Sequence, residues 1–296
     1  MLISGRVLSE ERKGEIIIFF EALLWGLFPV ITILSLRDVP TMLALAWSTL
    51  FAAIFFAIIV SIKKGWQQIG DRDAFFDIMM ATFIQGVAFY LLVFFGLRYT
   101  SSGNASLIGL SEIFFSFIFF NVWRKECISV AHIAGAVLMI LGASIVFYPN
   151  VHEFRLGDLL ILSAAFIAPL GNFFQRRARR KVNSETILFV RSLIGAVVIF
   201  GVAYFAKVSF AMVHAERTFI FLVINGFFLL GLSKFLWIEG IHRINVAKAG
   251  AIGGISPLLT LFFAWVMLGD IPTKFQLLSF IPMFFGMILL SKNKKQ

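Results

Sequence analysis

Residues 94–126 read FFGLRYTSSGNASLIGLSEIFFSFIFFNVWRKE, and residues 238–270 read IEGIHRINVAKAGAIGGISPLLTLFFAWVMLGD. The two stretches align without a gap at a constant offset of 144 (238 against 94), and the alignment continues beyond both. Identical pairs include Gly96 and Gly240, Ala105 and Ala249, Gly109 and Gly253, and Gly142 and Gly286. The preserved glycines, and the acidic residue that ends each stretch, indicate an internal repeat rather than chance matching of apolar residues.

The composition places this repeat in a membrane. The 296-residue chain is 60% hydrophobic and 14% charged, with a mean hydropathy of +0.94. Soluble domains carry about 25% charged residues, whereas here the charges stand in short clusters between long apolar runs, as in polytopic helical membrane proteins. Ten runs have the length of about 20 residues that a helical crossing requires. Their expected bounds are 15–36, 41–62, 74–97, 101–122, 128–148, 156–175, 185–206, 217–239, 246–268 and 273–291.

The basic residues predict the orientation of these spans. With the N-terminus in the cytoplasm, most Lys and Arg residues fall in the inside segments, including the cluster RRARRK at 176–181. This positive-inside bias predicts that both termini are cytoplasmic, and it explains the net charge of +10 without a nucleic-acid partner. The cluster has a second interpretation, which is recruitment of anionic lipid.

The number of spans in each repeat predicts the architecture. Each half, 15–148 and 156–291, contains five spans, and this odd number means that the second half inserts upside down relative to the first. Inverted repeats of this kind are common in secondary transporters, where the halves enclose a site near the midplane. We therefore expect an all-α integral membrane protein of ten helices, arranged as two inverted five-helix repeats.

The ten-span plan, the repeat and three local motifs resemble the EamA-like branch of the drug/metabolite transporter superfamily. The motifs are ALLWG at 22–26, NFFQRR at 172–177 and ISPLLTLFFAWVMLGD at 255–270. The resemblance covers nearly the whole chain and implies transport of a small molecule. It departs at Ile113, which stands where family members with a glutamate–proline pair have the proline that Pro257 supplies in the second half.

Glu112 lies in the apolar run LIGLSEIFFSFIFF at 107–120, where an ionised carboxylate is costly. Because residues three or four apart share a helix face, Glu112 belongs to a stripe of small and polar residues: Ser101, Ala105, Gly109, Glu112 and Ser116. The repeat places Ser256 at the equivalent position. Glu112 lies roughly 15 Å from either end of its span. It either binds substrate and couples transport to protons, or stays protonated within the helix packing.

Other polar residues inside the spans are further candidates. Glu21, Arg191 and Lys234 lie about 7–9 Å from the cytoplasmic ends of their spans. Glu21 belongs to a gate or to a static pair, and Arg191 has mainly a structural role. Lys234 either extends to the headgroups, forms a structural pair or faces a cavity. The residues expected to hold a polar metabolite, or else to fill the packing between helices, are Trp25, Gln85, Tyr90, Asn172 and Trp237.

These observations favour a secondary transporter, acting as an exporter, for a small polar or amphipathic metabolite such as an amino acid or derivative. Its expected partners are this substrate, the lipid bilayer and protons. One alternative keeps the fold and changes the cargo to a nucleotide- or lipid-linked sugar. A more remote alternative is an intramembrane enzyme, which needs a cluster of His, Asp or Cys within the spans. Because the sequence has no P-loop, no HExxH motif and no Cys/His cluster, we expect no ATP hydrolysis, metal or cofactor.

Three further expectations concern the setting of the protein. A single cysteine, Cys127, rules out an intramolecular disulfide. The spans 128–148 and 273–291 have almost no interior polarity, which fits peripheral helices or a homodimer contact. The first apolar run is too long for a cleavable signal peptide, and we expect a multi-pass protein of the bacterial inner membrane.

Overall fold

The computed structural model describes residues 9–122, 129–148, 155–210, 215–244 and 246–291. Cys127 lies outside these residues, as do some basic residues of the inside segments, among them Arg124 and Lys125. Within the described part, nine helical stretches are long and apolar enough to cross a membrane, and Lys274–Leu290 is a shorter apolar one. The helices agree with the ten expected spans to within a few residues.

Four spans of the described chain form in several pieces, and six are single helices. The single helices are α1 (Glu10–Ser35), α2 (Thr41–Ile62), α7 (Val130–Phe147), α8 (Leu156–Ala178), α9 (Ser184–Phe205) and α14 (Lys274–Ser291). The third span comprises α3 (Arg72–Ala81), the π-helix η2 (Thr82–Phe89) and α4 (Tyr90–Tyr99). The fourth comprises α5 (Ser102–Gly109), α6 (Ser111–Phe117) and the π-helix η3 (Ile118–Val122). The eighth comprises α10 (Ala215–Val223), the π-helix η5 (Ile224–Leu232) and α11 (Ser233–Ile241), and the ninth comprises α12 (Val246–Gly253) and α13 (Ser256–Leu268).

Side chains at the helix ends explain where several of these helices begin and stop. The side chains of Asp71 and Ser101 accept hydrogen bonds from backbone N–H groups in the first turns of α3 and α5, which satisfies donors that a helix start leaves free. Ser129 and His132 form a reciprocal capping box at the start of α7. Gly269 ends α13 with a φ of 77°, a left-handed conformation that favours glycine.

Two interruptions of the helices recur in the second half at or near the offset of the sequence repeat, whereas η3 has no counterpart because α13 is unbroken over 262–266. The fourth span breaks at Leu110, between α5 and α6, and the ninth breaks 144 positions later at Gly254–Ile255. The π-helix η2 likewise corresponds to η5, which begins two residues before the position that the offset predicts. The two halves therefore share local backbone irregularities as well as residues, which supports the two-repeat architecture.

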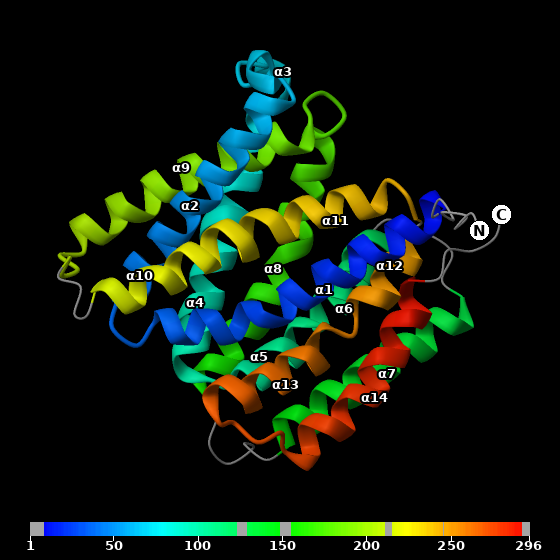
Figure 1. Cartoon of the computed structure of the whole chain (residues 1–296). Helices are drawn as coiled ribbons and strands as arrows, with labels where there is room; N and C mark the ends of the chain where they lie inside the picture. Colours follow the sequence, from blue (N-terminus) through cyan, green and yellow to red (C-terminus); the bar gives the residue numbers. More distant parts are fainter. Residues whose placement is uncertain (1–8, 123–128, 149–154, 211–214, 245, 292–296) are drawn as a thin grey trace, which may run out of the picture.

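Equivalent helices of the two halves pack against each other. The second and seventh spans, α2 and α9, form one such pair, and the fifth and tenth spans, α7 and α14, form another. Figure 1 shows α7 and α14 side by side at one edge of the bundle, and α1 begins at the side of the molecule where α14 ends. The peripheral place expected for the fifth and tenth spans is observed, whereas a homodimer contact there stays a prediction, as does the orientation in the membrane.

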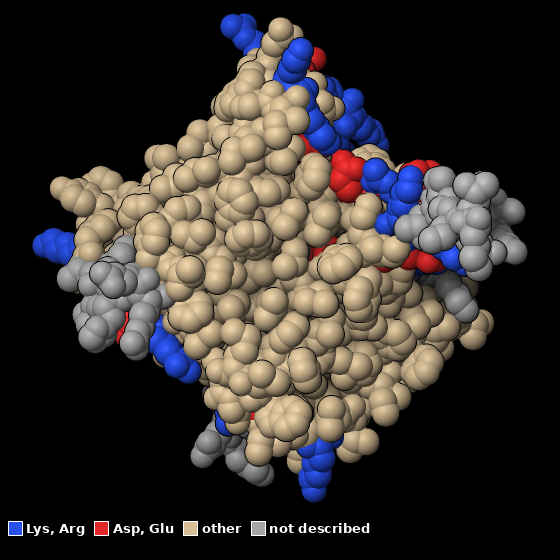
Figure 2. Space-filling model, in the orientation of Figure 1, with Lys and Arg blue, Asp and Glu red and all other residues tan. Residues whose placement is uncertain are grey.

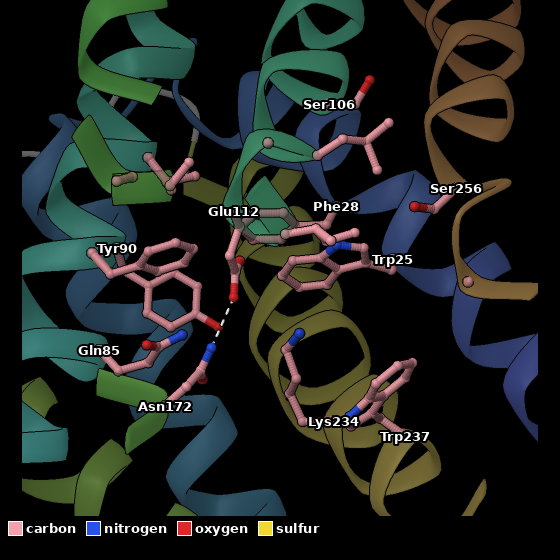
Figure 3. Close-up of a pocket in the computed structure, with 18 of the residues that line it drawn as sticks. Trp25, Phe28, Gln85, Tyr90, Ser106, Glu112, Asn172, Lys234, Trp237 and Ser256 are labelled. Carbon is pink, nitrogen blue, oxygen red and sulfur yellow. Dashed lines mark hydrogen bonds between the residues drawn. The ribbon is translucent and has the colours of Figure 1, made fainter. Parts of the chain in front are cut away.

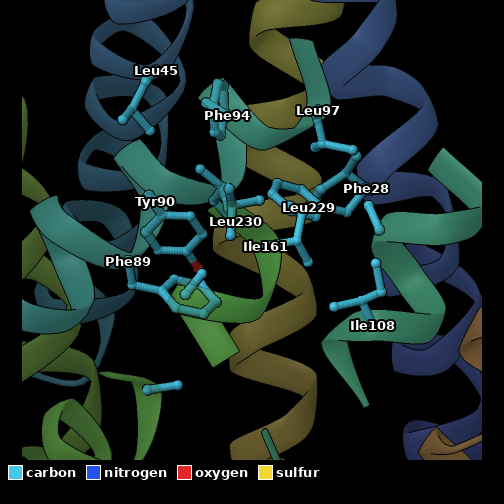
Figure 4. Packing of buried hydrophobic residues seen from close by; sticks show 14 of the residues in the cluster. Phe28, Leu45, Phe89, Tyr90, Phe94, Leu97, Ile108, Ile161, Leu229 and Leu230 are labelled. Carbon is cyan, nitrogen blue, oxygen red and sulfur yellow. The ribbon is translucent and has the colours of Figure 1, made fainter. Parts of the chain in front are cut away.

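The apolar residues form a continuous core between the helices. Phe28 of α1, Tyr90 and Phe94 of α4, and Leu229 of η5 are buried together (Figure 4). Large apolar side chains are also exposed on the outside, for example Phe166 and Phe262. On the face shown in Figure 2, charged residues gather mainly at the rim and leave a broad middle that is almost free of charge, as expected of a surface in contact with lipid.

Candidate functional site

A cavity of about 860 Å³ lies between helices of both repeats. Its wall is formed by the first, third and fourth spans from one half and by the sixth to ninth spans from the other, with a small contribution from α14. Its volume is within the range of small-molecule sites in proteins. All ten residues singled out in the sequence line it: Glu21, Trp25, Gln85, Tyr90, Glu112, Asn172, Arg191, Lys234, Trp237 and Ser256.

Glu112 enters the cavity from the first turn of α6, just after the break at Leu110. Its Oε1 accepts a hydrogen bond of 2.8 Å from Nδ2 of Asn172, which α8 presents from the other repeat. The ring of Tyr90 lies next to this pair (Figure 3). Of the stripe predicted along the fourth span, Ala105 and Gly109 also line the cavity, so this face of the helix points inward as expected.

Lys234 also faces the cavity and does not extend to the headgroups. Its Nζ lies 3.3 Å from the centroid of the Trp25 ring, and its charge interacts with the carboxylates of Glu21 and Glu112. The sequence predicts that Glu112 has no basic residue at the same depth in the membrane, because depth is estimated there from the number of residues along straight helices. In the structure the side chains of Glu112 and Lys234 are close enough for their charges to interact. The break at Leu110 and the π-helix η5, which ends directly before Ser233, are departures from straight α-helices that residue counting does not include.

Glu21 and Arg191 do not form an ion pair with each other. Glu21 is only 5% exposed and accepts a hydrogen bond of 3.2 Å from the Ser233 hydroxyl. Arg191 donates a hydrogen bond of 2.7 Å to Oε1 of Gln175, and its side chain lies against Gly86, where an added Cβ would come within 2.9 Å. Arg191 thus joins α9, η2 and α8 from the wall of the cavity.

The remaining predicted residues complete the wall. Gln85 lies on η2 against Gly171 of α8, and its Oε1 has no hydrogen-bond partner within the described residues. Trp237 packs near Gly253. Ser256, the counterpart of Glu112, begins α13 and is 9% exposed, so the repeat brings the two equivalent positions into one cavity.

Sequence reasoning missed two arginines in this site. Arg176 and Arg179 line the cavity although both are exposed. Their place at the end of α8, in the RRARRK cluster, predicted a role in topology or in lipid recruitment and not in a cavity. The cavity therefore extends to the end of the bundle that carries the RRARRK cluster. A helical spacing of three residues is the signal that places both side chains on one face.

The opposite end of the bundle is closed by polar contacts between the two halves. Nε2 of Gln276 donates a hydrogen bond of 2.8 Å to Oδ1 of Asn104, and the Thr100 hydroxyl is hydrogen-bonded to Asp158. Within the first half, Arg98 donates a hydrogen bond of 2.8 Å to the backbone oxygen of Leu36 at the same end. The exposed lining residues Arg176 and Arg179 lie at the other end, so the cavity opens there, and we predict this end to be the cytoplasmic one.

Ion pairs join several helices at the open end. Lys63, which follows α2, pairs with Glu185 of α9 and, at 3.2 Å, with Glu239 of α11. Burial lowers the pKa of Lys63, but the two carboxylates outweigh it and hold this pKa above its ordinary value of 10.5. Lys248 does not line the cavity. It pairs with Glu11 and Glu15 of α1, at the end of the bundle that we predict to be cytoplasmic.

The described residues contain no group of three or more His, Cys, Asp or Glu placed to hold a metal ion. The cavity instead presents two carboxylates, four basic side chains, amides and aromatic rings. Such a wall suits reversible binding of a polar molecule with an apolar part.

Comparison with known proteins agrees with this architecture. The chain is 26% identical to an uncharacterized transporter of Haemophilus influenzae over 94% of this chain and 96% of that protein. It is 22% identical to the uncharacterized transporter YoaV of Bacillus subtilis over 84% of this chain and 86% of that protein. It is also 23% identical to the uncharacterized transporter sll1164 of Synechocystis over 67% of this chain, but that match spans only 60% of the relative's length.

A solved crystal structure superposes with a TM-score of 0.69 over 94% of this chain and 96% of that chain, at 18% identity, which establishes the fold alone. The apolar helices make the protein a multi-pass integral membrane protein, and its bacterial relatives agree with an inner-membrane location. The profile of the EamA-like transporter family matches residues 12–148 and again residues 155–292. Because these two matches cover both halves, the chain belongs to the EamA-like transporter family, and it is a membrane transporter.

Proposed function

We propose that this transporter exports a small polar or amphipathic metabolite, with amino acids and their derivatives as the favoured class, in exchange for protons. The observation that carries the proposal is the placement of Glu112 in a cavity that both repeats enclose. A carboxyl inside a membrane that faces a cavity is a common site of proton or substrate binding. Aromatic rings around it, including Trp25 and Tyr90, suit the apolar part of such a molecule.

In this proposal, Glu112 binds either a proton or the positive end of the substrate. The groups that face it are Tyr90, Asn172 and Lys234, and Glu21 and Arg191 lie farther along the same wall. When the substrate's ammonium group takes the place of the proton, the proton leaves to the side on which the cavity is open. Return of the carboxyl in its protonated form then completes the exchange.

Alternating access is the means by which we propose that the cavity changes sides. The breaks at Leu110 and Gly254–Ile255 occupy equivalent places in the two halves. In inverted-repeat transporters, discontinuous helices typically form the binding site, and one repeat moves against the other around it. The contact between Gln276 and Asn104 closes the end away from RRARRK. With the predicted orientation, this arrangement corresponds to the inward-facing state.

A second cargo class is favoured by a separate observation. Arg176, Arg179 and Arg191 line the cavity together with Lys234, against the two carboxylates Glu21 and Glu112. Four basic side chains suit an anionic molecule. A nucleotide- or lipid-linked sugar therefore stays the second candidate.

Transport by the purified protein in proteoliposomes tests the proposal. Labelled amino acids and a labelled nucleotide sugar are supplied separately to vesicles with an acid lumen or with no pH gradient. Because protons that leave the lumen drive substrate inward in an exchange mechanism, we expect amino acids to accumulate only in the acid-lumen vesicles.

Dissipating the gradient with a proton ionophore is the control, and it should abolish accumulation. Accumulation of the nucleotide sugar in place of amino acids would favour the second cargo class. Amino-acid accumulation that is the same with and without the gradient would contradict proton exchange.

A further inference from the structure

Lys234 is a basic residue inside the cavity that lies on an aromatic ring and forms no ion pair with any described residue. Its Nζ is 3.3 Å from the centroid of Trp25. The carboxylates of Glu21 and Glu112 act on it only through space. Glu21 is already hydrogen-bonded to Ser233, and Glu112 is hydrogen-bonded to Asn172. The ammonium group therefore keeps its hydrogen-bond donors available to a ligand.

Trp25 is held so that one face of its ring is available to Lys234. The other face stacks on Phe28, with ring centroids 4.8 Å apart and an interplanar angle of 1°. Phe28 in turn contacts Tyr90 and Phe94 edge to face. This packing makes Trp25 a rigid wall of the cavity, whereas the lysine on its open face has a flexible side chain.

A carboxylate competes well against this aromatic contact. The free energy that an ammonium group gains over an aromatic ring is smaller than the free energy that it gains by donating a charge-assisted hydrogen bond to a carboxylate. A ligand carboxylate that enters the cavity can therefore draw Lys234 off Trp25. The ring face that Lys234 leaves is then open to an apolar or aromatic part of the same ligand.

Lys234 and Glu112 present opposite charges to one space. Figure 3 shows both side chains pointing into the cavity, with Trp25 beside them and Asn172 below Glu112. They come from different repeats, α6 and α11. We propose that Lys234 binds the carboxylate end of a zwitterionic substrate while Glu112 receives the ammonium end, and that Lys234 leaves the Trp25 ring when the substrate binds. This inference rests on the proposed function of the same cavity and names the substrate's charge pattern.

Paired ligands that differ only in the carboxylate test this assignment. Phenylalanine and phenethylamine share the ring and the ammonium group. Where another amino acid binds the wild type more tightly, that amino acid and its decarboxylated amine replace them. Binding to the purified protein is measured by calorimetry for the wild type, Lys234→Gln, Glu112→Gln and Lys248→Gln.

We expect the wild type to bind the amino acid at least about tenfold more tightly than the amine, as loss of a charged hydrogen bond implies. In Lys234→Gln the ratio of the two affinities should fall to near one, because the variant loses affinity for the amino acid and not for the amine. The unchanged affinity for the amine shows that the cavity is intact. In Glu112→Gln the affinity for both ligands should fall while the ratio of the two affinities stays as in the wild type. Lys248→Gln should bind both ligands as the wild type does.

A spectroscopic readout follows Trp25 itself. Amino-acid binding should change the indole emission of the wild type, and this change should disappear in Trp25→Phe, whereas the amine should produce little change. If Lys234→Gln prefers the amino acid over the amine by the same factor as the wild type, Lys234 does not bind the substrate's carboxylate. The proposed function would not be affected by that result. If the wild type neither binds nor transports any amino acid, the proposed function fails, and the assignment fails with it.

Discussion

At the scale of single residues, the contact between Asn172 and Glu112 decides how the carboxyl is presented. The amide donates to Oε1 at 2.8 Å from a helix of the other repeat. It leaves the second carboxyl oxygen without a hydrogen bond from any described residue. Asn172 therefore orients Glu112 and also leaves it able to bind a ligand or a proton.

The first prediction removes this hydrogen bond. We expect Asn172→Ala to weaken amino-acid binding by about 1–2 kcal/mol, or roughly five- to thirtyfold, because Glu112 loses its fixed orientation. Binding to the purified variant by calorimetry measures the effect.

Asn225→Ala is the matched control for this prediction. Asn225 is fully buried, donates a hydrogen bond of 3.0 Å to Thr32 and does not line the cavity. The Asn225→Ala variant should unfold at a lower temperature than the wild type and bind the amino acid with the same affinity. Equal losses of affinity in the two variants would argue against a specific role for Asn172.

Much of the wall was predictable at this scale, because polar residues inside apolar spans have few places to lie other than a cavity. This reasoning identified Glu112, Asn172 and Gln85. It did not find the position of Lys234 over Trp25, because depth was counted along straight helices. It also missed Arg176, since a basic residue at a helix end is usually a topology determinant.

At the scale of elements, the interruptions of the helices position the site. The fourth span breaks at Leu110 although Ile113 stands in place of a proline, and in the ninth span Pro257 lies within the first turn of α13, where proline is well tolerated. Gln85 lies on the π-helix η2, and Lys234 lies two residues after the π-helix η5. Such π-helices are often found at functional sites. Hydrophobic periodicity contains no signal for such changes of pitch.

The second prediction concerns the pair of helices α7 and α14. They cross where Gly135 and Gly286 meet, and an added Cβ on Gly286 would lie 2.8 Å from the Gly135 carbonyl oxygen. Because small residues permit this close approach, we expect Gly286→Leu to destabilise the protein by about 1–3 kcal/mol. The temperature of unfolding in detergent measures the change.

Gly201→Leu on α9 provides the comparison, because nothing lies within 4 Å of a Cβ added there. This variant should unfold at the wild-type temperature. A similar loss in both variants would argue against the crossing as the cause, because leucine favours a helix more than glycine and helix propensity alone would stabilise both.

At the scale of the whole molecule, the two repeats enclose one cavity with an open and a closed end. The open end carries Arg176 and Arg179, and the closed end carries the contact between Gln276 and Asn104. The repeat and the ten spans were predictable because a constant offset and span length are properties of the sequence. The side on which the cavity is open was not, since it depends on a small difference in packing between two states.

The third prediction tests the orientation. In a Cys127→Ser background, we expect a cysteine at Arg179 to react with a membrane-impermeant reagent only from the cytoplasmic side. A cysteine at Lys274, which precedes the last span at the other end, should react only from outside. Labelling of Arg179→Cys from outside intact cells would reverse the predicted topology.

The central claim is that Glu112 carries the proton that crosses the membrane in the direction opposite to the substrate. The direct measurement follows the lumen pH of proteoliposomes with a trapped pH-sensitive dye while a saturating amino-acid gradient is applied. We predict that substrate movement changes the lumen pH in the wild type and in the control Glu11→Gln, whose partner Lys248 keeps its pairing with Glu15. In Glu112→Gln, substrate exchange should persist without a pH change. Proton movement that accompanies the substrate equally in Glu112→Gln would contradict the account.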